Sequence, residues 1–199
     1  MLGFLPVGLL AFASVAAASC GPTVYFIRHG EKPEDGGNGL NTQGLERAKC
    51  IREVFGKKSE YNIGHIMAQT PKSSTVTPSP CVLSTKYIDQ GANVSDIDGK
   101  RARPRDTVKP LAEDLGLKVD IDCDRDDPKC VKKFIENYDG EGNILICWEH
   151  DTITDILETL GVQDAPHYPD DRFDLIWTVP SPWDKITEET SEHCPGLDH

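Results

Sequence analysis

Hydrophobic positions along the chain follow two alternating patterns. Short runs of consecutive apolar residues are typical of strands buried on both faces of a sheet, and they predict strands at 23–28, 65–69, 117–121, 143–150 and 173–179. Between these runs, apolar residues recur at intervals of three and four, which predicts helices at 42–55, 105–115, 130–138 and 152–161. The alternation predicts an α/β fold, a three-layer sandwich with a mostly parallel central sheet and helices on both faces.

Two segments lie outside this alternation. Residues 1–18 carry no charged side chain and end in Ala16-Ala17-Ala18, which predicts a signal peptide cleaved near Ala18 or Ser19, rather than a buried N-terminal helix. The domain would then cover 19–199. Residues 73–98 are rich in Ser, Thr and Pro without either period, so we favour a disordered insertion or loop over a substrate-facing lid or an error in gene translation.

The length and net charge of the chain limit the number of domains and the kinds of binding partner that can be expected. The 199 residues suffice for one substantial domain. The net charge of −12 disfavours nucleic acid and anionic membranes as partners, so we expect neither once the signal peptide is removed. An anionic substrate would need a local positive pocket on this acidic protein.

The seven cysteines fit an oxidising compartment if the chain is secreted, so we expect an extracellular location. Cys123 and Cys130 bracket a short polar loop that a disulfide could close, whereas Cys147 lies in an apolar strand and is interpreted as a core residue. The other pairings stay open. The chain has no C-x-x-C, so the spacing does not indicate zinc.

Two of the predicted strands end in residues of types that are common in active sites. "TVYFIRHGEK" delivers Arg28-His29-Gly30, and "NILICWEHD" delivers Glu149-His150-Asp151. Ligands of parallel sheets bind at the carboxyl ends of the strands, so we expect both histidines at one edge of the sheet.

These residue types suit phosphoryl transfer. A neutral histidine nitrogen is a good nucleophile toward phosphorus. The planar fork of arginine matches the equatorial oxygens of the transferring group, and a glycine lets the backbone approach the phosphate. Arg28 is therefore a candidate phosphate-binding residue and His29 a candidate nucleophile. Gly30 would leave room for the phosphate beside the backbone.

"FIRHGEK" resembles the signature of the histidine phosphatase superfamily, which includes phosphoglycerate mutases and histidine acid phosphatases. Further segments agree in order: "LNTQGLERA" (40–48) resembles the helix after the signature, and "RPRDTVKPLAEDLGL" (103–117) resembles the segment with a second phosphate-binding arginine, here Arg103. "ILICWEHD" (144–151) resembles the strand that delivers the second histidine, here His150. The resemblance covers residues 23–160.

The resemblance implies a phosphomonoester hydrolase that acts on a small phosphorylated substrate. His29 would form a covalent phosphohistidine, Arg28, Arg103 and His150 would stabilise the charge, and water would release the phosphate. Neither a metal nor an organic cofactor is implied. His150-Asp151 resembles the His-Asp pair of the acid phosphatase branch, so Asp151 is the favoured proton donor, with Glu31 and Glu149 as alternatives. Such a carboxyl must be protonated to act.

The chain also departs from the family pattern. Glu149 and Asp151 flank His150 where the mutase branch has glycines, which favours a hydrolase over a mutase. A phosphotransferase or mutase, and a non-catalytic secreted protein of the same fold that binds a phosphate ligand, stay open as alternatives. The oligomeric state is open as well.

Several other residues receive structural interpretations. Trp148 and Trp177 are expected in the core. The basic residues Lys100, Arg101 and Arg105 are assigned to solvent, and the acidic stretch 166–174 is interpreted as a solvated turn.

Overall fold

The computed structural model describes residues 21–72 and 100–198. The predicted signal peptide at 1–18 and the irregular segment at 73–98 lie outside the described residues, so both remain predictions.

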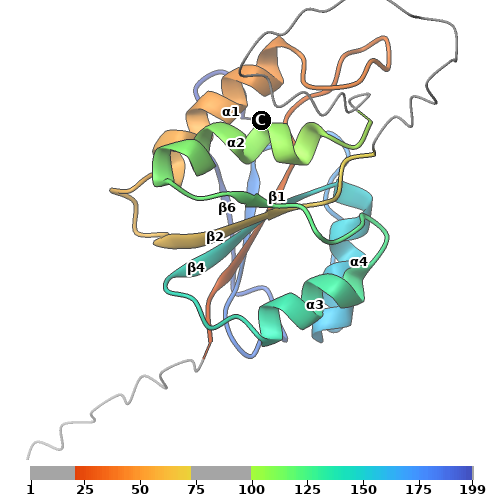
Figure 1. Cartoon of the computed structure of the whole chain (residues 1–199). Helices are drawn as coiled ribbons and strands as arrows, with labels where there is room; N and C mark the ends of the chain where they lie inside the picture. The colour runs from red at the N-terminus through yellow and green to blue at the C-terminus, as the bar shows by residue number, and fades with distance from the viewer. Residues whose placement is uncertain (1–20, 73–99, 199) are drawn as a thin grey trace, which may run out of the picture.

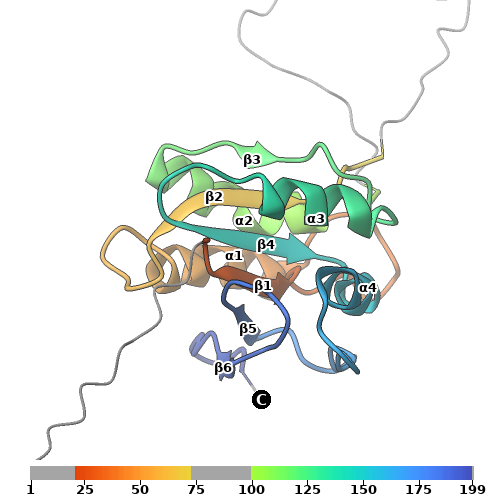
Figure 2. The same cartoon turned by 90° about the horizontal axis from the view of Figure 1, so that it is seen from below.

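A six-stranded sheet forms the centre of the fold, with the strand order β3-β2-β4-β1-β5-β6 (Figure 2). The strands are β1 (Val24–Arg28), β2 (Ile63–Ala68), β3 (Val119–Asp120), β4 (Asn143–Trp148), β5 (Leu175–Val179) and β6 (Glu188–Ser191). The first four pair in parallel, and β5 and β6 extend the sheet in antiparallel pairing beyond β1.

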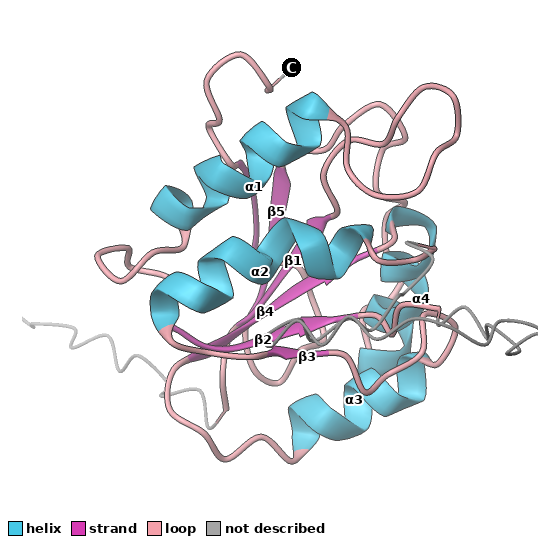
Figure 3. Cartoon of the chain, turned by 45° about the horizontal axis from the view of Figure 1, so that its top comes forward, coloured by secondary structure: helices cyan, strands magenta, loops and turns pink. Residues whose placement is uncertain are grey.

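Four helices cover the two faces of this sheet. They are α1 (Thr42–Val54), α2 (Arg103–Leu115), α3 (Pro128–Glu136) and α4 (His150–Leu160). Helices α1 and α2 lie on one face and α3 and α4 on the other (Figures 1 and 3). The predicted three-layer α/β sandwich with a mostly parallel sheet is therefore confirmed. None of the helices in the described ranges has the length and apolar character needed to cross a bilayer.

The core is divided by the sheet into two clusters, and this explains the continuous apolar runs in the sequence. In β4, Leu145 and Cys147 pack toward the cluster under α1 and α2, while Ile144 and Ile146 pack toward the other. Trp148 and Trp177 are buried in the second cluster, as expected. Successive strand residues point to opposite faces, so a strand covered on both faces needs apolar residues at every position.

Local signals account for the helix ends. The Asn41 side chain accepts a hydrogen bond from the Gly44 N–H and caps α1, and Asp127 caps α3 in the same way through Cys130. Helix α2 starts at Arg103, two residues earlier than predicted, because Pro104 fits the first turn, where a missing N–H costs nothing. Gly116 ends α2 with a φ of 74°, a conformation that favours glycine.

Strand β6 was not predicted. Its sequence Glu-Glu-Thr-Ser has no apolar alternation, because β6 is an edge strand whose first two residues are exposed. Polar residues are ordinary in such strands, since they discourage pairing with other chains.

Two disulfides cross-link the described part of the chain, one over a short loop and one over a long distance in sequence. Cys123 pairs with Cys130, as the sequence suggested, and Cys50 on α1 pairs with Cys194 after β6. Cys147 is a buried free thiol. The two bridges close loops of very different length, with sequence separations of 7 and 144 residues.

We therefore expect the two bridges to differ in their contribution to stability. Loop-closure entropy predicts a loss of about 5 kcal/mol in the free energy of unfolding for Cys50→Ser/Cys194→Ser, against about 2 kcal/mol for Cys123→Ser/Cys130→Ser. Urea unfolding of both double variants measures the difference. Equal losses would mean that the longer bridge does not restrict the unfolded chain as its loop length suggests.

Candidate active site

The pairing of β1 with β4 brings the two predicted histidines together. The register aligns Arg28 with Trp148, so His29 and His150 each lie just beyond the end of a strand. The backbone N–H of His29 donates to the Trp148 carbonyl at 3.1 Å. One ring nitrogen of each histidine and a Glu149 oxygen lie within 4.8 Å of one another.

The ring of His29 is held in one tautomer. Its Nδ1 lies 2.7 Å from the Gly30 carbonyl oxygen. A carbonyl can only accept, so Nδ1 carries the proton and donates it, which leaves Nε2 with a free lone pair. The side chain is 3% exposed. His29 therefore has a buried, oriented nitrogen able to act as a nucleophile.

The surroundings of His29 keep it neutral. The pKa of the imidazole is lowered to about 4, mainly by burial and also by the charges of Arg28 and Arg103, while the Gly30 carbonyl and Glu149 act in the opposite direction. Removal from water disfavours the charged form of any histidine. At neutral pH the ring is thus unprotonated at Nε2.

Arg28 holds a loop as well as facing the site. Its Nη1 donates to the carbonyls of Pro169, Asp170 and Arg172 at 3.1, 2.7 and 2.7 Å, and its guanidinium lies 3.8 Å from the centre of the Phe173 ring. Its Nε is buried and has no hydrogen-bond partner among the described residues. Burial lowers the pKa of Arg28. The Nε–H of Arg28 is therefore a buried donor that the described residues leave unpaired.

Arg103, at the start of α2, lies close enough to His29 to affect its pKa. Its Nε donates to the Gly39 carbonyl at 2.9 Å and its Nη2 to the Gly37 carbonyl at 3.2 Å. These contacts fix the direction of the guanidinium beside the site. The structure thus brings Arg103, 74 residues further along the chain, to the edge where His29 lies.

The structure explains the glycine at position 30 in a different way from the sequence prediction. A Cβ on Gly30 would lie 3.0 Å from the Cα and carbonyl oxygen of Gly44, and one on Gly44 would lie 2.6 Å from the Glu31 carbonyl oxygen. The two glycines allow the loop after β1 to pack directly on α1. The sequence argument assigned this space to a phosphate, whereas in the structure helix α1 takes it.

The start of α4 adds further polar groups to the site. Glu149 precedes the helix, and its N–H donates to the Oε1 of Gln69, which is buried at the end of β2. His150 Nδ1 lies 2.8 Å from Glu149 Oε1. Helix N-termini carry unpaired N–H groups and a partial positive charge, which favours anions there.

The carboxyl groups near His150 differ in their exposure to solvent. Burial raises the pKa of Glu149, but its contact with His150 and the charges of His150, His29 and Arg125 outweigh this, and the pKa lies below its usual range. Glu149 is therefore an anion at neutral pH. Asp151 is 69% exposed, lies 3.4 Å from His150 Nε2, and shares that nitrogen with Asp170 at 3.1 Å.

Glu31 is engaged elsewhere. Its Oε1 lies 2.7 Å from Nη2 of Arg47 on α1, and both of its oxygens accept from Nε of the same residue. The carboxylate is thus bound edge-on by a guanidinium, which favours an acceptor over an acid.

Some residues of the site were missed by sequence reasoning. The stretch 166–174 was interpreted as a solvated turn, and this was wrong: its carbonyls bind Arg28, its Tyr168 is buried, and Phe173 lies 6.3 Å from the His29 ring. Thr107 is buried and accepts from the Gly30 N–H at 2.9 Å. Arg101 was assigned to solvent, yet it pairs with Asp124 and Asp126. Loop carbonyls leave no signal in a sequence.

A cavity of about 550 Å³ opens beside these groups. Arg103, Glu31 and Phe173 line it, together with Lys32 and Gln43 from the loop after β1 and the start of α1. Its size suits a small ligand or a side chain of a larger one.

Two groups of described residues have donor atoms close enough for a metal ion: His29 with Glu149 and His150, and His150 with Asp151 and Asp170. Two arginines lie beside the first group, and positive charge opposes a cation there. The prediction that the protein needs no metal remains a prediction.

The structure was compared with known proteins. No family model and no curated protein matches the chain by sequence. Among solved structures, a protein from Agrobacterium tumefaciens assigned as the phosphohistidine phosphatase SixA matches with a TM-score of 0.53 and 13% identity, covering 86% of this chain and 98% of that one. The chain has the SixA fold.

A second SixA structure, of the protein histidine phosphatase complexed with tungstate, matches with a TM-score of 0.53 and 13% identity. It covers 85% of this chain and 97% of the other. SixA proteins are members of the histidine phosphatase superfamily, so the predicted resemblance is confirmed at the level of the fold.

The electrostatics of His29 give a direct test. We expect the imidazole to stay neutral down to about pH 4 and Arg103→Met to raise its pKa, because the arginine charge disfavours the protonated ring. Histidine side-chain NMR across pH 3–8 measures both. Arg105→Met, on the same helix but paired with Asp106, is the matched control and should leave His29 unchanged. Titration of His29 near pH 6.5 would contradict the buried environment.

Proposed function

We propose that the protein is a phosphatase that acts through a covalent phosphohistidine on His29. The observation that carries this proposal is the bond from Nδ1–H to the Gly30 carbonyl, which leaves Nε2 unprotonated in a site where the ring is neutral. The Nε2 lone pair forms the N–P bond as the bond from phosphorus to the leaving group breaks. Water then attacks phosphorus, the N–P bond breaks, and inorganic phosphate leaves.

Several groups around His29 would stabilise the negative charge on the phosphoryl group during its transfer. Arg28 and Arg103, whose charges act on His29, lie near it together with the ring of His150 and the N-terminus of α4. Preorganised donors of this kind stabilise a transferring phosphoryl group without a cofactor.

The substrate we propose is a small phosphorylated group, either an ester or the phosphorylated imidazole of a histidine. The second is suggested by the two SixA neighbours, of which one is named as a phosphohistidine phosphatase and the other as a protein histidine phosphatase. The cavity beside Arg103 would take the leaving group.

Asp151 remains the proposed proton donor. Glu149 is held as an anion by His150, and the Glu31 carboxylate is engaged by Arg47, so both are poorly placed to donate a proton to a leaving group. Asp151 lies at the mouth of the site, where it can recover a proton from water.

We also propose that the protein works outside the cell. The two disulfides of the described chain support an oxidising compartment.

A phosphate-binding protein without turnover is the second candidate. It is favoured by the three carbonyls on Nη1 of Arg28, which leave fewer donors for a transition state than a free arginine would offer. The experiment below separates the two.

Hydrolysis of an aryl phosphate by the chain from Ser19 onward tests the proposal. We expect His29→Asn to reduce turnover by roughly 10³-fold or more, because the covalent route is lost. The matched control is His193→Asn, an exposed histidine whose φ of 54° asparagine tolerates.

Intact-mass measurement after a rapid acid-free quench should reveal a phosphate adduct in the wild type. Phosphate binding without turnover or adduct, tried on both an aryl phosphate and phosphohistidine, would support the binding protein instead.

The proton donor is tested with leaving groups of different basicity. Asp151→Asn should have little effect on a nitrophenyl phosphate and reduce turnover of an alkyl phosphate by about 10²-fold, since only the more basic leaving group needs a proton. Glu149→Gln is the comparison. If Glu149→Gln, rather than Asp151→Asn, shows the dependence on the leaving group, the assignment of the donor is wrong.

A further inference from the structure

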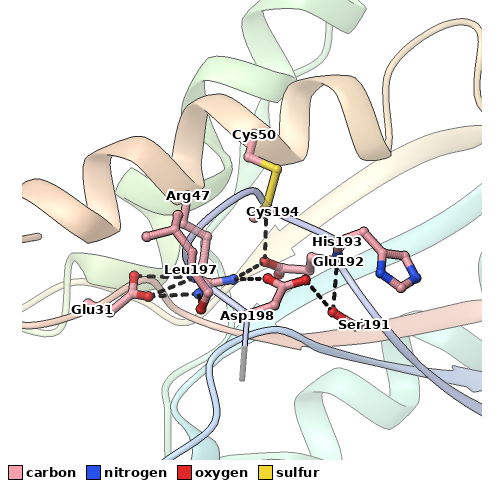
Figure 4. Close-up of a disulfide and its surroundings, with 9 residues drawn as sticks. All are labelled: Glu31, Arg47, Cys50, Ser191, Glu192, His193, Cys194, Leu197 and Asp198. Atoms are coloured by element: carbon pink, nitrogen blue, oxygen red, sulfur yellow. Dashed lines mark hydrogen bonds and ion pairs between the residues drawn. A yellow bond between two sulfur atoms is a disulfide. The ribbon is translucent and has the colours of Figure 1, made fainter.

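Arg47 is a fully buried cation that the proposed reaction does not use. It lies on α1, and its guanidinium contacts three carboxyl groups and one carbonyl (Figure 4). Nη1 lies 2.6 Å from Glu192 and 3.7 Å from Asp198, Nη2 donates to the Leu197 carbonyl at 2.8 Å, and Nε and Nη2 bind Glu31. Burial lowers the pKa of Arg47, but Glu31 and Glu192 outweigh this and raise it, so the group stays charged.

Glu31 connects this cation to the candidate nucleophile. Its backbone nitrogen forms the peptide bond to Gly30, and the carbonyl of that peptide accepts the Nδ1–H of His29. The other side of the same loop is held by Thr107 at the Gly30 N–H. The direction of the Gly30 carbonyl therefore depends on where the Glu31 side chain is anchored.

Three of the four groups around Arg47 come from one segment, residues 192–198 after β6. The Cys50–Cys194 disulfide joins this segment to α1 three residues beyond Arg47, which is about one helical turn along the same face. Glu192 and Leu197 are themselves buried. Figure 4 shows the segment against α1 with Arg47 between it and Glu31.

Arg47 cannot hold Glu31 alone. A buried charge that loses its partners is strongly unfavourable, so without residues 192–198 the guanidinium would turn toward water or admit it. Either change would release the Glu31 carboxylate from its place.

We propose that Arg47 is a positioning residue for His29, and that residues 192–198 are part of the support of the active site. Arg47, compensated by this segment and fixed beside it by Cys50–Cys194, anchors Glu31. Glu31 in turn holds the Gly30 carbonyl that keeps the proton on Nδ1 and the lone pair on Nε2. This inference rests on the proposed role of His29 as nucleophile.

The experiment compares Arg47→Met, Arg47→Lys and the wild type. We expect Arg47→Met to lower kcat for an aryl phosphate by about 10- to 100-fold with KM changed less than threefold, because the nucleophile is misdirected while Arg28 and Arg103 still bind phosphate. Arg47→Lys should recover part of the loss, since it restores the charge but not the fork.

Nitrogen-15 NMR of the histidine rings gives a readout that does not depend on catalysis. In the wild type His29 should show a protonated Nδ1, and in Arg47→Met a mixture of the two tautomers. A shift of tautomer in a protein that has no turnover at all would uphold the positioning role and refute the proposed function. An unchanged tautomer and kcat in folded Arg47→Met would overturn the inference.

Two further variants keep the test decisive if Arg47→Met does not fold. Glu192→Gln replaces the buried carboxyl group that lies 2.6 Å from Arg47 Nη1 at constant shape and should lower kcat several-fold, whereas His193→Asn, at the next and exposed position, should not. An effect of equal size in both would overturn the role of the segment. Glu31→Gln should lower kcat equally for nitrophenyl and alkyl phosphates, while a loss that grows with leaving-group basicity would make Glu31 the acid instead.

Discussion

The parallel pairing of β1 with β4 is the interaction on which the site depends. Because Arg28 is aligned with Trp148, the residues after both strands meet at one edge of the sheet, and the N–H of His29 binds the last carbonyl of β4. Both strands are buried on both faces, so a shift of register by one residue would turn core side chains to the wrong layer. The relative placement of His29 and His150 is thus protected by the packing of the whole core.

At this edge of the sheet, positively and negatively charged side chains lie close together. Burial, together with the charges of Arg28 and Arg103, keeps His29 neutral, and His150 helps to keep Glu149 ionised. Each cation is also bound by backbone carbonyls, of the 169–172 loop for Arg28 and of Gly37 and Gly39 for Arg103. The carbonyls hold these side chains in direction without neutralising their charge, which is what a preorganised anion site requires.

The sequence alone was sufficient for the layers and for the edge that carries the site. Continuous apolar runs and helical periods mark the buried strands and the four helices, and a strand ending in Arg-His-Gly marks the edge. The sequence was not sufficient for contacts made by the backbone. The carbonyls that bind Arg28 come from residues 141 to 144 positions away, and no residue type indicates them. Strand β6 was missed because an exposed edge strand carries no apolar pattern.

Arg47 illustrates the same limit, and it bears on the order in which the protein can be completed. Its helix is made early in synthesis, but most of its compensating groups lie about 150 residues later, in the segment joined to α1 by Cys50–Cys194. Domains begin to fold while the chain is still emerging from the ribosome. A partly synthesised chain that lacks residues 192–198 would therefore carry His29, Arg28 and Arg103 without most of the groups that compensate Arg47. The surroundings of Arg47 would be completed only after the strands of the parallel sheet have been made.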